Sequence, residues 1–390
     1  MSESLHSSAE AAGERVRIEI PALTGLRGVA ALWVLLFHTW QTVGAPRIEW
    51  LGVPVWYVLS AGWMGVDLFF VLSGFLLGAP FACAAYDGLP RPDLGRFWRR
   101  RIGRVVPAYW GQLLVLAGLA WWVDGSWPLT LWETLAQFTL TENLLPVFQE
   151  SLNPVYWSLP VEWDFYVLLP LLVLLFRRLK PWQVFAMVIV FSVAWRFACV
   201  GAIEHWGEDG IRFYTTILQL PSRLDEFFAG ILAGLAVGKA RVARPRVAML
   251  AGMALVLVMA ALLSGVGDFI GEAKLPWVVL CYSVLAVAFG LIVAGAASGG
   301  KVARVLFANP PLRAAGVISY SLYLWHFPIL GWLREAGWAG RDAGFAVSLG
   351  SALLATVVVS VLSWRLLERP FHTPPRPPEK APAAPAREAP

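Results

Sequence analysis

The sequence predicts an all-α polytopic membrane protein with about ten transmembrane helices around a polar cavity. Hydrophobic residues make up 58% of its 390 residues and charged residues only 15%. Soluble domains usually contain about 45 to 50% apolar and about 25% charged residues. The third observation is a series of long apolar stretches, because a helix needs roughly 20 apolar residues to cross a bilayer.

The apolar stretches give the predicted order of elements. They cover residues 22–43, 56–80, 105–123, 155–176, 182–203, 213–238, 247–265, 275–297, 312–333 and 344–367. We therefore place a ten-span core in residues 20–372. Residues 1–19 form a polar cytoplasmic N-terminus without the pattern of a signal peptide, so the first span is expected to direct insertion. Residues 373–390 form a Pro- and Ala-rich cytoplasmic tail that is expected to be disordered.

Basic residues indicate the orientation of the core in the membrane. Six arginines lie between residues 91 and 104, after the second span, and three basic residues lie between 177 and 180, after the fourth. Cytoplasmic loops are enriched in Lys and Arg, so both termini are predicted to be cytoplasmic. The connection 124–153 has no Lys or Arg but contains Trp127 and Trp132, which favours a position along the outer interface.

Composition also argues against several other classes. The net charge of +5 fits basic loops collected on one side of a membrane, and we find no nucleic-acid-binding motif. Cys83, Cys199 and Cys281 are widely spaced within apolar stretches, which indicates neither a disulfide framework nor a zinc site. We expect them to be small core residues, and no metal site is predicted.

The first span, LTGLRGVAALWVLLFHTW, contains Arg27 and His38. His38 follows Arg27 by about three helical turns, so the two lie on one face of the helix, roughly 16 Å apart along its axis. An ionisable side chain that faces lipid costs several kcal/mol unless it is paired or solvated, so both are expected to face inward. The alternative is that Arg27 extends to the near interface and His38 bonds to a neighbouring helix.

Three further ionisable residues are predicted to lie at the depth of His38, in the outer half of the bundle. They are Asp67 of the second span, Glu162 of the fourth and His326 of the ninth. Intramembrane residues of this kind are rare and usually face a shared interior, so we expect a common polar cavity. Pro160 is expected to break the fourth helix near Glu162.

The sixth span has charged residues of its own. The segment QLPSRLDEFFAG contains Arg223, Asp225 and Glu226, close enough in sequence to pair locally. The expectation here is a structural ion pair.

A basic cluster precedes the third span. In the segment FWRRRIGRVVPAY, Arg100, Arg101 and Arg104 lie at the predicted cytoplasmic end of the helix, the same side as Arg27. Guanidinium groups bind phosphate oxygens bidentately, so these arginines are candidates to bind a phosphorylated cosubstrate. The simpler interpretation is a topology signal.

The motifs now resemble a known family. Arg27 and His38, FFVLSGF, FWRRRIGRVVPAY, WSLPVEWDFY, SYSLYLWHFP and the terminal LLERPF are similar, in this order, to the membrane acyltransferase 3 family. The resemblance covers residues 20–372. Each motif is weak alone, but six in sequence on matching spans are specific.

The resemblance implies a ten-helix core that transfers acyl groups from cytoplasmic acyl-CoA, a cosubstrate rather than a permanently bound cofactor, to a hydroxyl. The acceptor is often a carbohydrate of the cell envelope and sometimes a macrolide. The resemblance also implies that Arg27 and His38 are the essential pair, and that Arg100, Arg101 and Arg104 form the cytoplasmic arginine motif. No esterase-like extracytoplasmic domain of the kind fused to some members is recognisable, which leaves the acceptor open.

The chemistry of acyl transfer assigns candidate roles to these residues. His38 is the candidate base, or transient acyl carrier, because its ordinary pKa is near neutrality. Glu162 is the candidate to orient the imidazole, with Asp67 as the competing partner. His326 is either an oxyanion donor or acceptor contact, or a packing residue. Arg27 would hold the phosphate-bearing part of the donor.

Two other classes of protein fit part of this pattern. A proton-coupled transporter also places ionisable residues at mid-membrane, but such proteins commonly contain an internal repeat, and none is visible between the halves of this chain. A catalytically silent scaffold or sensor could retain the same helices. Hydrolysis or transfer of acyl-CoA by the purified protein distinguishes the enzyme from both.

Overall fold

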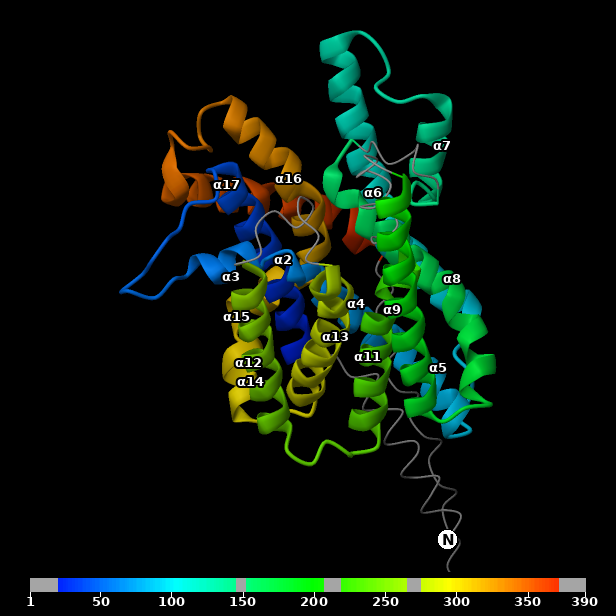
Figure 1. The fold of residues 1–390 in the computed structure, drawn as a ribbon. Helices are drawn as coiled ribbons and strands as arrows, with labels where there is room; N and C mark the ends of the chain where they lie inside the picture. Colours follow the sequence, from blue (N-terminus) through cyan, green and yellow to red (C-terminus); the bar gives the residue numbers. More distant parts are fainter. Residues whose placement is uncertain (1–19, 145–151, 207–218, 265–274, 372–390) are drawn as a thin grey trace, which may run out of the picture.

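The computed structural model describes residues 20–144, 152–206, 219–264 and 275–371 (Figure 1). The predicted N-terminal segment 1–19 and tail 373–390 lie outside these residues. The regular structure of the described residues is helical, and their one β-bridge joins Trp50 to Val53. This architecture confirms the predicted all-α class.

Eight helices or continuous helical runs in the described residues are long and apolar enough to cross a membrane. The spans are α2 (Pro21–Thr42); α4 (Met64–Ser73) with η1 (Gly74–Gly78) and α5 (Ala79–Tyr86); α6 (Leu94–Asp124); η3 (Pro154–Trp157) with α8 (Ser158–Phe176); part of α9 (Pro181–Trp206); α12 (Pro245–Ser264); part of α13 (Leu275–Ala297); and α17 (Gly344–Ser363) with η4 (Trp364–Glu368) and η5 (Arg369–Phe371).

Two more helices occupy the positions of the sixth and ninth predicted spans. α11 (Leu220–Gly238) has three charged residues near its start, and α16 (Ser319–Glu335) has 17 residues. The described residues therefore agree roughly with the expected ten spans. Short helices complete the fold, namely α3 (Trp56–Ser60), α7 (Leu131–Thr139), α14 (Lys301–Phe307) and α15 (Pro310–Val317).

Glycines allow the central helices to approach closely. A Cβ atom at Gly74 would lie 1.9 Å from the Phe227 carbonyl oxygen, and one at Gly230 would lie 1.9 Å from the Val71 oxygen. Each helix thus places a glycine against the backbone of the other, as small residues do in membrane helix packing.

Helix α2 lies between α4, α15 and α16, and this position determines where its polar side chains point (Figure 1). Near the start of α2, Arg27 contacts Ser319, the first residue of α16. Near its end, His38 contacts His326, two helical turns further along α16. The two helices therefore run parallel, with the polar face of α2 against α16.

Two predicted local features differ in the structure. α8 continues through Pro160, because a proline in the first turn of a helix removes an N–H group that has no intrahelical acceptor. α6 begins at Leu94, well before the predicted residue 105, so its arginines lie on the helix itself. Asp93 caps α6 by accepting from the Arg96 backbone N–H at 3.0 Å, a bond that lowers the pKa of the Asp93 carboxyl.

The connection after α6 contains a short amphipathic helix. α7 starts with a capping box in which Thr130 and Glu133 bond to each other's backbone N–H groups. It lies beside α6 (Figure 1), where the indole of Trp110, near the middle of α6, donates to the Phe138 carbonyl. Trp132 is 67% exposed on this helix, which fits the expected position along the outer interface.

Candidate active site

The clearest feature at the predicted site is a pair of histidines. His38 Nδ1 lies 3.0 Å from His326 Nε2, and the ring centroids are 5.0 Å apart. His38 is half-buried, whereas His326 is only 1% exposed. The structure therefore brings together two of the four predicted catalytic residues, and it places His326 behind His38.

The hydrogen bonds around the pair determine where the protons lie. His326 Nδ1 is 2.6 Å from the Tyr323 carbonyl oxygen, which can only accept, so Nδ1 carries a proton. In the neutral ring, Nε2 of His326 is then an acceptor. His38 Nδ1 faces this nitrogen and the Val34 carbonyl, at 3.1 Å, so it carries a proton too. The lone pair of neutral His38 is consequently on Nε2, which has no hydrogen-bond partner among the described residues.

The backbone of α16 beside His326 is held by two side chains that the sequence interpretation missed. Pro328 has no N–H group, so the Leu324 carbonyl loses its helical partner. Gln112 Nε2 donates to that carbonyl at 2.6 Å, and Asn153 Nδ2 does so at 2.9 Å. A proline four residues after Leu324 was the available signal, but it could not show which helices would supply the donors.

Aromatic side chains line the space between Arg27 and His38. The Arg27 guanidinium lies 5.9 Å from the centroid of the Phe69 ring, and Phe69 contacts Tyr323 edge-on at 6.2 Å. Further along, the Phe327 ring packs edge-on against His38 at 5.2 Å. The rings of Phe69, Tyr323 and Phe327 thus form an aromatic wall between Arg27 and His38.

Arginines gather at the other end of this face. Arg101 and Arg104 of α6 are half-buried and lie within electrostatic range of Arg27. The Arg101 guanidinium lies 5.9 Å from the Tyr166 ring centroid of α8. Arg100, in contrast, is exposed on the surface of α6. Three of the four predicted phosphate-binding arginines thus lie near one another, and Arg100 lies outside this group.

Glu162 lies with these arginines, which corrects the expected pairing with His38. Its Oε1 atom accepts a short hydrogen bond from Ser73 Oγ, directly before the π-helical turn η1, and it is within electrostatic range of Arg27. At His38 the orienting side chain is His326. The predicted common depth with the histidines is therefore also wrong, because the packing of α8 directs Glu162 toward α4 and the arginine end of α2.

A second carboxylate at this end was not identified from the sequence. Glu368 is fully buried at the end of the π-helical turn η4, and its Oε1 atom accepts from Ser321 Oγ at 2.5 Å. It interacts electrostatically with Arg104 and Arg27. π-Helical turns often occur at functional sites. The two in the described residues lie beside the arginine group, since η1 begins directly after Ser73 and η4 ends at Glu368. The LLERPF motif contained the signal, without indicating a role for its glutamate.

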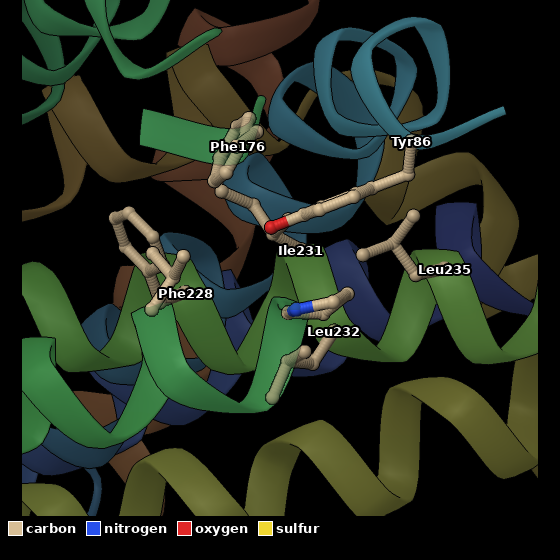
Figure 2. A pocket seen from close by; sticks show the side chains of 8 residues that line it. Tyr86, Phe176, Phe228, Ile231, Leu232 and Leu235 are labelled. Atoms are coloured by element: carbon tan, nitrogen blue, oxygen red, sulfur yellow. The ribbon is translucent and has the colours of Figure 1, made fainter. Parts of the chain in front are cut away.

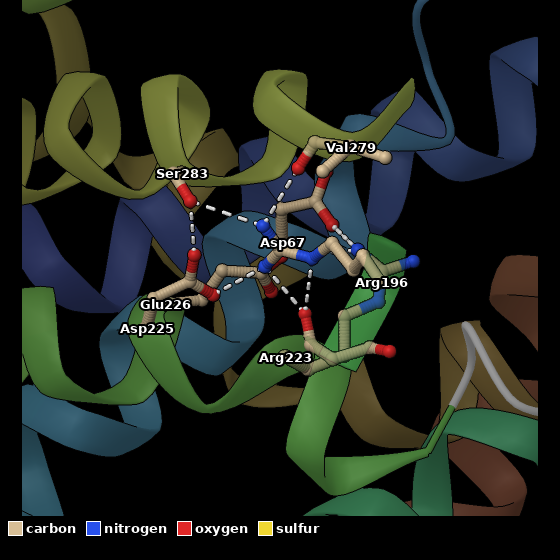
Figure 3. Close-up of polar contacts among 8 residues, drawn as sticks. Asp67, Arg196, Arg223, Asp225, Glu226, Val279 and Ser283 are labelled. Carbon is tan, nitrogen blue, oxygen red and sulfur yellow. Dashed lines mark hydrogen bonds and ion pairs between the residues drawn. The ribbon is translucent and has the colours of Figure 1, made fainter. Parts of the chain in front are cut away.

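Asp67 is the second correction. Its Oδ1 atom accepts from Arg223 Nη1 of α11 at 2.7 Å (Figure 3), and not from either histidine. The expected local pair of Arg223 and Glu226 is present at 3.0 Å. Asp225, however, pairs with Arg196 of α9, a residue that the sequence interpretation missed. The lone arginine in the apolar segment FSVAWRFACV was the available signal.

Other candidate features are structural. Cys199 and Cys281 are buried, Cys83 is half-buried, and all three are free thiols. Figure 2 shows a pocket between α5, α8, α9 and α11 that is lined by apolar side chains and Tyr86. Its volume of about 10 Å³ can hold one water at most. Within the described residues, no group of three or more His, Cys, Asp or Glu side chains could hold a metal ion.

Comparison with known proteins supports an acyltransferase. The chain is similar to the O-acetyltransferase OatA of Staphylococcus aureus strains NCTC 8325 and COL, with 23% identity over 376 residues in each case. Each alignment covers 90% of this chain and 57% of the relative, so the chain spans little more than half the length of these proteins. No solved structure gives a significant match.

The profile of the acyltransferase domain family, Acyl_transf_3, matches residues 20–365. This range contains Arg27, His38, Arg104, Glu162 and His326. The expected family and the expected enzyme class are thereby confirmed. The chain belongs to the acyltransferase 3 family of membrane proteins.

Proposed function

We propose that this membrane acyltransferase transfers an acetyl or short acyl group from cytoplasmic acyl-CoA to a hydroxyl of a carbohydrate or macrolide-type acceptor of the cell envelope. The observation that carries the proposal is the polar face of α2, which has Arg27 among arginines at one end and the His38 pair at the other. The similarity to the O-acetyltransferase OatA supports acetyl as the transferred group and oxygen as its acceptor.

The arginine group is suited to the phosphates of coenzyme A. Arg27, Arg101 and Arg104 provide three permanent positive charges, and guanidinium groups match phosphate oxygens bidentately. Glu162 and Glu368 partly neutralise these charges in the protein alone. The carboxylate of Glu162, which is half-buried, can also accept from an amide N–H group in the pantetheine arm. The arm then extends along the aromatic wall toward His38.

His38 performs the proton transfers. Its Nε2 atom takes the proton of the acceptor hydroxyl as the oxygen attacks the thioester carbonyl. The carbon–sulfur bond then breaks, the new ester forms, and the imidazolium returns the proton to the departing thiolate. Throughout, Nδ1–H remains bonded to His326, which keeps the lone pair on Nε2 in the way that the third member of a triad does. In the alternative order of events, Nε2 of His38 first takes the acyl group from the thioester as a covalent acyl-imidazole and then passes it to the acceptor hydroxyl.

The experiment is an acyl-transfer assay on the purified full-length protein in detergent or nanodiscs. Acetyl-CoA and a panel of longer acyl-CoAs are offered with carbohydrate and macrolide acceptors, and free CoA thiol and acylated product are measured. Wild type should release thiol, and His38→Ala should lower kcat by roughly 10² to 10⁴-fold, the usual effect of losing a positioned base. Acetyl-CoA binding by the variant should be unchanged, because Arg27, Arg101 and Arg104 remain.

His38→Gln separates catalysis from substrate positioning. Glutamine retains a hydrogen-bond donor and acceptor but takes no proton at neutral pH, so it should be as inactive as alanine. Full activity in His38→Gln would reject the base assignment. An absence of thiol release by wild type with every donor would instead favour a transporter or a silent scaffold.

A further inference from the structure

Five charged side chains from three helices meet inside the protein (Figure 3), and the proposed mechanism uses none of them. The buried charge cluster consists of Asp67 of α4, Arg196 of α9, and Arg223, Asp225 and Glu226 of α11. None of these side chains is more than 2% exposed. Such a concentration of charge inside a membrane protein is retained only if the charges compensate one another.

One half of the cluster is fully compensated. Arg196 Nη2 lies 2.6 Å from Asp225 Oδ1, and the other oxygen of Asp225 accepts from Ser283 Oγ at 2.5 Å. Arg196 also donates to the backbone carbonyls of Ser222 and Val279. Asp225 and Arg196 therefore form a one-to-one ion pair in which both carboxylate oxygens are satisfied.

The other half has one cation for two carboxylates. Arg223 Nη1 lies 2.7 Å from Asp67 Oδ1 and 3.0 Å from Glu226 Oε1, so two carboxylate oxygens share one nitrogen. Asp67 Oδ2 and Glu226 Oε2 are buried, and neither has a hydrogen-bond partner among the described residues. Two ionised carboxylates would leave one negative charge without compensation.

The described groups that act on the two carboxylates include no further cation. The titratable groups that interact with Asp67 and Glu226 from the helices packed against them are Arg196, Arg223, Asp225, Cys281 and Tyr282. The Tyr282 ring of α13 covers Arg223, with its centroid 3.7 Å from the guanidinium carbon, and Trp157 lies 5.4 Å away. These rings exclude solvent from the guanidinium.

We propose that the cluster is a proton-binding site, in which Asp67 and Glu226 together hold one proton at neutral pH. The proton comes from water and sits on a carboxyl oxygen outside the Arg223 bonds, so that one carboxylic acid donates to the other carboxylate. One added proton satisfies both unpartnered oxygens and makes the cluster neutral. A metal cation fits less well, because it would lie beside Arg223 and find only two uncommitted oxygens.

The test measures the proton directly on the full-length protein in nanodiscs at pH 7. Infrared difference spectra between wild type and Glu226→Gln should show a carboxylic acid C=O band in wild type that the variant loses. The band should shift in D₂O. Asp67→Asn should also lose it, because either amide replaces the neutral acid and leaves a single carboxylate for Arg223.

Asp225→Asn is the matched control. It removes the same charge from the same helix, but from the satisfied half, so the acid band should persist. Its melting temperature should fall by roughly 5 to 10 °C, because Arg196 loses its counter-ion. Glu226→Gln should melt close to wild type. The double variant of Asp67→Asn and Glu226→Gln should fall as far as the control, because Arg223 then has no anion.

Three results would overturn the proposal. The first is the absence of a carboxylic acid band in wild type, a result that does not depend on whether any variant folds. The second is a Glu226→Gln protein that melts as low as Asp225→Asn, since that would mean that both carboxylates are ionised. The third is a melting temperature that rises with Na⁺ or K⁺ concentration in wild type but not in Glu226→Gln, which would identify a metal cation as the ligand. The proposal does not depend on the enzymatic activity.

Discussion

The two histidines have different tasks because their surroundings differ. His38 is half-buried with a free Nε2, whereas His326 is buried and uses both nitrogens within the protein. In the proposed mechanism, His38 therefore meets the substrate and His326 acts through it as a positioning residue.

His326→Phe should lower kcat by roughly 10- to 100-fold, the usual cost of losing a partner that orients a functional side chain. Phenylalanine fills the space but accepts no hydrogen bond from His38 Nδ1. The KM for acetyl-CoA should be unchanged. His326→Gln should recover part of the activity, since its amide oxygen can take the place of Nε2. Equal activities of the two variants, per amount of folded protein, would mean that His326 only packs.

At the scale of elements, the arginines of α6 lie on different faces of the helix. Its N-terminal part, before the predicted start at residue 105, presents Arg101 and Arg104 toward Arg27, and Arg100 toward the exterior. All three are equivalent as topology signals, because that effect depends on charge near the membrane and not on the face of the helix.

Arg101→Gln and Arg104→Gln should therefore raise the KM for acetyl-CoA more than they lower kcat. Contacts to phosphate far from the thioester stabilise the bound substrate and the transition state equally. Arg100→Gln is the matched control, with the same loss of charge and little expected change in KM. Steady-state kinetics on equal amounts of purified protein measure this. If all three variants lose activity only as their abundance falls, the arginines are topology signals.

At the scale of the whole molecule, the orientation in the membrane decides which substrate reaches which end of the site. The arginine group must face the cytoplasm for acyl-CoA to reach it. The basic connections predict this orientation and place both termini in the cytoplasm.

Reporter fusions in a bacterial host test the orientation. Alkaline phosphatase fused after Arg246 should be inactive, because the connection between α11 and α12 is predicted to be cytoplasmic. The same reporter fused after Gly125, at the outer end of α6, should be active. Activity after Arg246 together with inactivity after Gly125 would invert the topology and with it the assignment of the arginine group to the donor.

The sequence by itself determined the class of the protein, the approximate helices and the common face of Arg27 and His38. In lipid, backbone groups must bond within the chain, so long apolar stretches become helices and residue spacing sets depth and face along each one. The family followed from motifs in the correct order, which the profile over residues 20–365 confirms.

Only the tertiary structure decided which polar side chains meet. The sequence predicts one depth for Asp67, Glu162, His38 and His326, but the structure separates them into three groups, with Glu162 at the Arg27 end of α2. Rotation of each helix about its axis and the choice of neighbours come from packing, as where Gly74 and Gly230 bring α4 against α11. Because of that contact, Asp67 pairs with Arg223. The packing of α8 places Glu162 against Ser73, and the parallel contact of α2 with α16 places His326 against His38.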